Sequence, residues 1–188
     1  MALDHYSLCP CGSGKKIKFC CSNDILPELE KVVRAIEGDQ RNSAVDQLTH
    51  LMEYKGKRPA LLALKAEIQL SLEDAEGATQ TAQEFLQRDP ASPLALSLAT
   101  LAAAQRGDIV SAVQKVHKSL EAVLERKTLD TSFFEALDAV GNAMLEQGDV
   151  MGARAYFMLM SVFAAEGDSM PPVQELASID RNPSLVCL

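Results

Sequence analysis

Four of the five cysteines lie in one stretch of thirteen residues near the start of the chain. Cys9 and Cys11 flank Pro10, and Cys20 and Cys21 are adjacent, which gives the spacing C-x-C-x8-C-C. Four thiolates that meet at one point satisfy the tetrahedral coordination that zinc prefers. We therefore predict a Zn²⁺ site with Cys9, Cys11, Cys20 and Cys21 as its ligands. Because the protein fills all four positions, the predicted metal is structural rather than catalytic.

The residues between the cysteines suit this chemistry. Gly12 and Gly14 let the backbone take a positive φ and fold over the ion, and Lys15, Lys16 and Lys18 lower the thiol pKa values and offset negative charge. A disulfide pair and unpaired thiols are the alternatives, although nothing in the sequence indicates the oxidising compartment that disulfides need. A phosphate-binding loop is excluded, because the Gly-Ser-Gly-Lys-Lys run lacks that motif's first glycine and its final hydroxyl residue.

The stretch Cys9–Lys16, followed by Phe19-Cys20-Cys21, resembles the SEC-C motif. This motif is the small zinc module at the C-terminal end of the SecA translocase ATPase, and it is appended to many other bacterial proteins. Ile17 stands where that family usually has an aromatic residue. The resemblance implies a docking role, with a partner of the export-chaperone (SecB) or ribosome type. The residues expected at the partner-binding surface are Lys15, Lys16, Ile17, Lys18 and Phe19.

The charge of the chain is unevenly distributed. The first 23 residues hold three lysines and one aspartate, whereas the rest holds 15 basic and 25 acidic residues, a net charge of −10. A body this acidic is a poor match for DNA or an anionic membrane surface. No apolar run approaches the ~20 residues of a membrane-spanning helix, and the start of the chain does not resemble a signal peptide. We expect a cytoplasmic protein with reduced thiols, no DNA partner and no membrane insertion.

The rest of the chain predicts an all-α fold. Apolar residues recur at helical spacing, and no segment alternates as a strand would. Glycine followed by aspartate ends one helix and caps the next, and this pair occurs at Gly38-Asp39, Gly107-Asp108, Gly148-Asp149 and Gly167-Asp168. The apolar spacing and the residues that end helices together predict eight helices, at 26–37, 42–55, 59–72, 75–88, 93–106, 109–127, 131–147 and 150–166.

A spacing of 34 residues recurs among these helices. It separates Pro59 from Pro93, Asp74 from Asp108, and Ala78 from Ala112. A 34-residue helical hairpin is the unit of the tetratricopeptide repeat (TPR), and the chain resembles that family most around Leu137, Gly141, Met144, Ala153 and Phe157. We predict antiparallel hairpins stacked in a TPR-like solenoid; an ordinary helical bundle is the alternative. The predicted domains are a zinc module at 1–23, a repeat domain at 24–170, and a tail at 171–188 with a short helix.

Two functional hypotheses follow. The first is a non-enzymatic adaptor, in which the zinc module docks to a macromolecule and the repeats bind protein. The second is a ribosome- or RNA-binding protein that uses Lys15, Lys16 and Lys18. An enzyme is disfavoured, because no nucleophile–base set or open metal site is evident. We interpret His5, His50 and His117 as surface or core residues, and Cys187 as a spare thiol.

Overall fold

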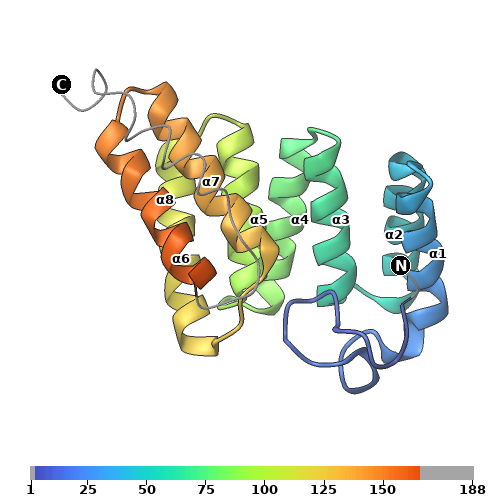
Figure 1. The fold of residues 1–188 in the computed structure, drawn as a ribbon. Coiled ribbons are helices and arrows are strands. Elements are labelled where there is room, and N and C mark those ends of the chain that lie inside the picture. Colours follow the sequence, from blue (N-terminus) through green and yellow to red (C-terminus); the bar gives the residue numbers. More distant parts are fainter. Residues whose placement is uncertain (1–2, 166–188) are drawn as a thin grey trace.

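The computed structural model describes residues 3–165 (Figure 1). It is all-α in this range, as predicted; pairing of the β type is limited there to one isolated bridge, between Leu8 and Lys16. The predicted helix starts and ends agree with the structure to within one residue. After two 3₁₀ turns, η1 (Ile17–Phe19) and η2 (Asn23–Ile25), come α1 (Leu26–Glu37), α2 (Arg41–Lys55), α3 (Pro59–Ser71), α4 (Ala75–Arg88), α5 (Pro93–Gln105), α6 (Ile109–Arg126), α7 (Thr131–Glu146) and α8 (Val150–Ala165).

The predicted aspartate caps explain why several helices begin where they do. Asp74 accepts a hydrogen bond from the backbone N–H of Gly77 at 2.9 Å, and Asp108 accepts one from Ser111 at 3.1 Å. Each bond satisfies an N–H that has no partner within the helix. The Gly38-Asp39 pair does not form such a cap. Asp39 has a positive φ of 55°, and Gln40 rather than Asp39 is the residue before α2. The pair Gly167-Asp168 and the predicted tail lie outside the described residues.

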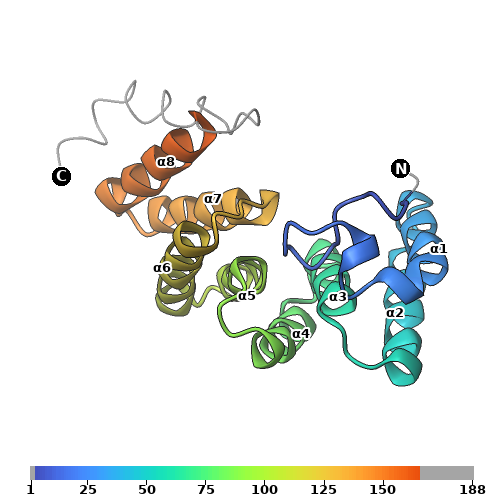
Figure 2. The ribbon, with the colours of Figure 1, turned by 90° about the horizontal axis from the view of Figure 1, so that it is seen from below.

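The helices form consecutive antiparallel hairpins that stack into an arc, in agreement with the predicted solenoid. Within the arc, α3 packs on α4, α4 on α5, α5 on α6 and α7, and α7 on α8. Figure 2 shows α3, α5 and α7 on the inner side of the arc and α4 and α6 on the outer side. The segment 3–22, here called the Cys loop, lies in the hollow of the arc, between α1, α3 and α7.

Small residues let neighbouring helices approach closely. Ala66, Ala78, Ala112 and Ala153 are fully or almost fully buried. A Cβ on Gly141 of α7 would lie only 2.8 Å from the ring of Phe157 in α8. Larger residues fill the spaces between the pairs in two clusters, one spanning α1 to α5 and the other α5 to α8.

Helix α5 is the most enclosed helix of the arc. From Pro93 to Ala103 only Leu101 is more than slightly exposed. A helix that is apolar on every side needs cover on every side, and α5 has α4, α6 and α7 around it and the Cys loop against its first turn. None of the helices within residues 3–165 combines the length and the apolar character needed to cross a lipid bilayer.

Candidate metal centre

Two short stretches of backbone pairing fold the Cys loop back on itself. The N–H of Cys9 donates to the carbonyl of Lys15 at 2.8 Å, and the N–H of Ile17 donates to the carbonyl of Ser7 at 2.9 Å. Between these bonds the chain reverses through Gly12 and Gly14, which have φ values of 71° and 68°. Positive φ is unfavourable for residues with a Cβ. The predicted positive φ of the two glycines is therefore confirmed.

The second pair of cysteines is positioned by the two 3₁₀ turns. Turn η1 ends at Phe19, directly before Cys20, and the N–H of Cys20 donates to the carbonyl of Ile17 at 3.0 Å. Ile17 is fully buried and forms a small apolar cluster with Cys9, Cys11, Leu26 and Ala60. Ile17 therefore does not belong to a partner-binding surface, where the sequence had placed it. In this 3₁₀ turn its side chain is buried in the apolar cluster beside the cysteines.

The four sulfur atoms converge. All lie within 4.8 Å of one another, with 3.7 Å between Cys9 and Cys21 and 3.4 Å between Cys11 and Cys20. Zn–S bonds of about 2.3 Å place the sulfurs of a tetrahedral site roughly 3.8 Å apart. These four thiols are free cysteines rather than disulfides. They form a cluster that can hold a metal ion, and the described residues contain no other such cluster of Cys, His, Asp or Glu.

Three of the four thiols resist ionisation, and Cys20 ionises more readily than an ordinary cysteine. The pKa of Cys21 is raised to about 11, mainly by its contact with Cys11, with burial adding to the effect. The pKa of Cys9 is also raised to about 11: its contact with Cys11 lowers the pKa, but its contact with Cys21 and burial outweigh this. The pKa of Cys11 is raised to about 11 as well: its contact with Cys21 lowers the pKa, but its contact with Cys9 and burial outweigh this. Burial raises the pKa of Cys20, but hydrogen bonds from Ser13 and from the backbone lower it by a larger amount, so that the pKa is about 7. Four thiolates in so small a space need a cation, and this donor set fits a soft divalent metal.

Hydroxyl groups line the sulfurs. The Oγ of Ser22, which is fully buried, lies 3.1 Å from the Sγ of Cys9, and the Oγ of Ser13 lies 3.2 Å from the Sγ of Cys20. Hydrogen bonds from neighbouring groups orient metal ligands and tune their basicity. Ser22 stands where the SEC-C family often has glycine, and here its side chain contacts the cluster.

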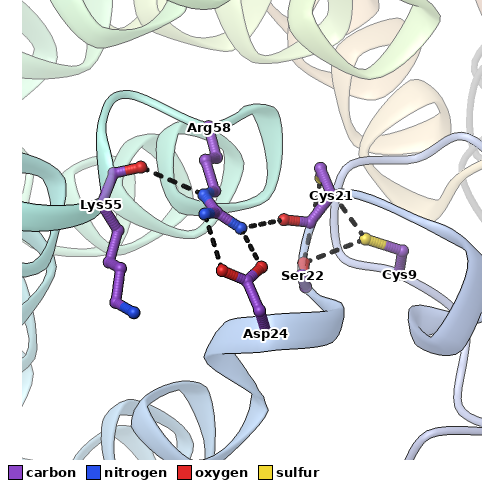
Figure 3. A network of polar contacts seen from close by, with 6 residues as sticks. All are labelled: Cys9, Cys21, Ser22, Asp24, Lys55 and Arg58. Carbon is purple, nitrogen blue, oxygen red and sulfur yellow. Dashed lines mark hydrogen bonds and ion pairs between the residues drawn. The ribbon is translucent and has the colours of Figure 1, made fainter.

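Helix α3 also reaches the cluster (Figure 3). The guanidinium group of Arg58, the residue directly before α3, donates to the carbonyl of Cys21 at 2.9 Å and forms a two-pronged ion pair with Asp24. The backbone N–H of Ala60, in the first turn of α3, donates to the thiol of Cys21 and favours its ionised form. These contacts join residues 34 or more positions apart, and no local pattern in the sequence predicts them.

The Cys loop also rests on the helices behind it. A Cβ on Gly12 would lie 2.8 Å from the Cβ of Leu94 in α5, and one on Gly14 would lie 3.6 Å from Thr128, before α7. The loop thus packs on the inner side of the arc. Turn η2 continues across the domain boundary predicted at residue 23, and the division of the chain into domains stays a prediction.

The exposed side chains of the loop are largely basic and aromatic. Lys15, Lys16, Lys18 and Phe19, all expected at a surface, are exposed. Sequence reasoning missed Tyr6 and Leu8, which are 64% and 66% exposed beside them. The sequence does contain a signal for their exposure. In an extended segment successive side chains point to opposite sides, so a buried Cys9 predicts that Leu8 is exposed, and Tyr6 two residues earlier shares its side. We call these six residues the outer face: Tyr6, Leu8, Lys15, Lys16, Lys18 and Phe19.

The amino groups of two lysines lie over the aromatic rings of this face. Nζ of Lys16 is 5.4 Å from the centre of the Tyr6 ring, and Nζ of Lys18 is 5.6 Å from that of Phe19. Cation–π contacts at exposed sites are worth about 0.5–1 kcal/mol. None of the three lysines forms an ion pair with another described residue. Their charges therefore stay available to an anionic group.

The other candidates from the sequence lie apart from the cluster. His5 is exposed and is not among the converging ligands. His50 pairs with Glu53 on the surface, and Nε2 of His117 lies 3.0 Å from the hydroxyl of Tyr156. Cys187 lies outside the described residues.

Comparison with known protein families finds no match, and comparison with the curated proteins finds none either. The likenesses to the SEC-C motif and to tetratricopeptide repeats therefore remain resemblances of particular residues. The evidence on function comes from the geometry of the four-cysteine cluster and from the exposed residues of the outer face.

Proposed function

We propose that this protein is a zinc-binding adaptor, whose Cys loop presents a rigid docking surface to another macromolecule. The observation that carries the proposal is the convergence of four thiols within 4.8 Å. Soft thiolates in a tetrahedral set favour zinc over the harder divalent cations. Four protein ligands leave no position for water or substrate, so the proposed role of the metal is structural and the protein is proposed to be non-catalytic.

The outer face supports a docking role. Phe19 is 69% exposed, and with Tyr6 and Leu8 it places three large apolar side chains in contact with water on a short loop. Aromatic anchors with a charged rim are typical of protein interfaces. The cationic rim favours a partner with an acidic surface, and the resemblance to the SEC-C motif points to an export chaperone or the ribosome. The helical repeats are proposed to contribute further protein contacts.

RNA is the second candidate partner. Exposed rings beside lysines can stack on unpaired bases while the ammonium groups contact phosphates. Tyr6, Phe19 and the three lysines provide both kinds of group. The acidic body of the chain opposes a long nucleic acid, so binding on this hypothesis is confined to a short single-stranded segment.

Metal analysis tests the first half of the proposal. Protein purified under reducing conditions is expected to contain about one equivalent of zinc. The Cys20→Ser/Cys21→Ser variant is expected to contain none, because two of its four ligands are lost. Less than half an equivalent in the wild type, after incubation with zinc and removal of the excess, contradicts the proposal.

Binding assays test the second half. Immobilised zinc-loaded protein is presented with purified SecB-type chaperone, with purified ribosomes and with fluorescent oligo(U). Docking to protein predicts that Tyr6→Ala/Phe19→Ala abolishes capture. Tyr54→Ala, which removes an aromatic ring that is 75% exposed on α2, is the matched control and is expected to change nothing. RNA binding predicts instead that oligo(U) is captured, and that its affinity falls with salt at a log–log slope of about −2, since each of three phosphate contacts contributes about −0.7.

A further inference from the structure

The four cysteines differ in what holds them. Cys9, Cys11 and Cys20 contact hydroxyl and thiol groups of the Cys loop itself. Cys21 is in addition held from α3, through its carbonyl by Arg58 and through its sulfur by the N–H of Ala60. One of the four candidate ligands is therefore held by the solenoid as well as by the loop.

Arg58 makes more contacts than an ordinary surface arginine. Its Nε donates to the carbonyl of Lys55 at 3.1 Å, which fixes the guanidinium plane at the end of α2. Its two terminal nitrogens bind both carboxylate oxygens of Asp24, and one of them also binds the carbonyl of Cys21. The side chain is 25% exposed. Figure 3 shows the group reaching from α3 toward the segment that leaves the metal cluster.

The charge of this contact suits a metal–thiolate centre. A divalent ion with four thiolates would carry a net charge of −2, and Arg58, whose charge is largely balanced by Asp24, adds a smaller favourable interaction with Cys21. The N-terminus of α3, which carries a partial positive charge, also lies at the cluster, because the N–H of Ala60 donates to the thiol of Cys21. Arginine is well matched to this position, because its planar fork serves the carboxylate and the carbonyl together.

We propose that Arg58 is a positioning residue of the metal centre, which clasps the exit of the Cys loop to α3 so that metal binding and packing of the loop on the solenoid stabilise each other. The inference rests on the proposed zinc function. Coupling of this kind is reciprocal: if the clasp increases zinc affinity, zinc stabilises the clasped arrangement by the same free energy. The loop also leads directly into α1 through η2, so zinc is expected to stabilise the position of the first hairpin against α3.

The experiment compares Arg58 with a second arginine of the same kind. Arg126, the last residue of α6, forms a two-pronged ion pair with Asp89 at 2.6 and 2.7 Å, and it lies in no contact with the cysteines. Three variants of the full chain are made: Arg58→Gln, Arg58→Lys and Arg126→Gln. Zinc affinity is measured by competition with a chromophoric chelator, thermal unfolding is measured with and without zinc, and helical content is checked by circular dichroism.

We expect Arg58→Gln to weaken zinc binding about 10- to 100-fold, the range found for residues that orient metal ligands. Arg58→Lys keeps the charge but loses the fork, so it is expected to recover only part of the affinity. Arg126→Gln is expected to lower the unfolding temperature without changing zinc affinity. The stabilisation of the protein by zinc is expected to shrink in Arg58→Gln and to stay at the wild-type value in Arg126→Gln.

Two results overturn the inference, and they are distinguishable. If Arg58→Gln binds zinc within twofold of the wild type, Arg58 is an ordinary structural residue and the zinc function still stands. If the wild type itself binds no zinc, the proposed function fails and the inference fails with it. The charge-transfer absorption of Co²⁺ bound in place of zinc gives an independent readout. A spectrum identical in the wild type and Arg58→Gln, at saturating Co²⁺ and with equal affinity, contradicts a positioning role.

Discussion

Two arginine–aspartate pairs join segments that are distant in the sequence, and they have almost the same chemistry. Asp24 pairs with Arg58 across 34 residues, and Asp89 pairs with Arg126 across 37. Each guanidinium group meets both oxygens of its carboxylate, and each pair is partly open to solvent. They differ in what lies next to them. The first pair touches the backbone of a candidate metal ligand, whereas the second joins the ends of α4 and α6 within the solenoid.

The comparison indicates that the contribution of an ion pair to stability depends on what else holds the segments that it joins. Exposed ion pairs contribute about 0–1 kcal/mol on their own. The ends of α4 and α6 are already held by the burial of neighbouring side chains such as Phe85 and Val123. The Cys loop has a smaller apolar core, chiefly the cluster around Ile17, so we expect its position to depend more strongly on the four-cysteine cluster and on the contact with Arg58.

Removal of the metal is expected to have the largest effect, and it should separate the two regions. With zinc chelated, or in Cys20→Ser/Cys21→Ser, the Cys loop and the first turn of α3 are expected to lose protection from hydrogen exchange. Segments this short seldom fold without their metal. Helices α5 to α8 are expected to keep their protection, because their core is independent of the cysteines. Hydrogen exchange followed by mass spectrometry provides the measurement.

Cys187→Ser serves as the control for this experiment, because it removes a cysteine outside the cluster. It is expected to retain the wild-type zinc content and exchange pattern. Equal loss of protection in α3 and α7 after chelation would mean that the metal stabilises the whole arc, and the contrast between the two regions would then be incorrect.

Two glycines allow the Cys loop and the solenoid to be compared again, because each glycine lies where two segments pack closely: Gly12 of the loop on α5, and Gly141 of α7 on α8. A methyl group on Gly12 would lie 2.8 Å from Leu94, and one on Gly141 would lie 2.8 Å from the ring of Phe157. Overpacking of this kind costs about 1–3 kcal/mol, and Gly12, with φ of 71°, adds about 1–2 kcal/mol of backbone strain. We expect both Gly12→Ala and Gly141→Ala to destabilise the protein in urea unfolding, and only Gly12→Ala to weaken zinc binding. A loss of zinc affinity in Gly141→Ala would show that the two surfaces are coupled.

The helices could be predicted from the sequence because their start and end signals are local. Asp74 and Asp108 accept hydrogen bonds from residues three positions later, and Pro59 and Pro93 occupy the first positions of α3 and α5. The recurrence of these signals at a spacing of 34 residues was enough to indicate stacked hairpins. The spacing of the four cysteines likewise indicated that their sulfurs converge.

The placement of the Cys loop on the solenoid could not be predicted in this way. Its contacts with Arg58 and Leu94 join residues far apart in the chain, and each of those residues is ordinary in its local sequence. The same limit explains Ile17: the resemblance to the SEC-C motif implied a partner-binding surface there, whereas the side chain is buried at the 3₁₀ turn.

The smallest expected effect on stability concerns Glu67, a carboxylate that has no arginine partner among the described residues. Hydrogen bonds from Arg58 and from Arg126 lower the pKa values of Asp24 and Asp89. No ion pair is found for Glu67 of α3 among the described residues, and its pKa is raised to about 7. Reduced hydration by the surrounding protein is the main cause, and the charges of Asp130 and Glu135 add to it. The side chain still contacts water, so the expected effect on stability is modest.

The sign of this effect is opposite to that of the paired aspartates. Because the folded protein holds the Glu67 proton to a higher pH than the unfolded chain does, its contribution to stability is full below pH 4.5 and is lost as the pH rises toward 7. The aspartates contribute above pH 3.8 and lose their contribution as the pH falls through their lowered pKa values. We expect Glu67→Gln, compared with the wild type at saturating zinc, to gain relative stability between pH 5 and 8. A stability difference that stays constant over this range would show that Glu67 titrates normally and that the arc tolerates an unpaired carboxylate at this position.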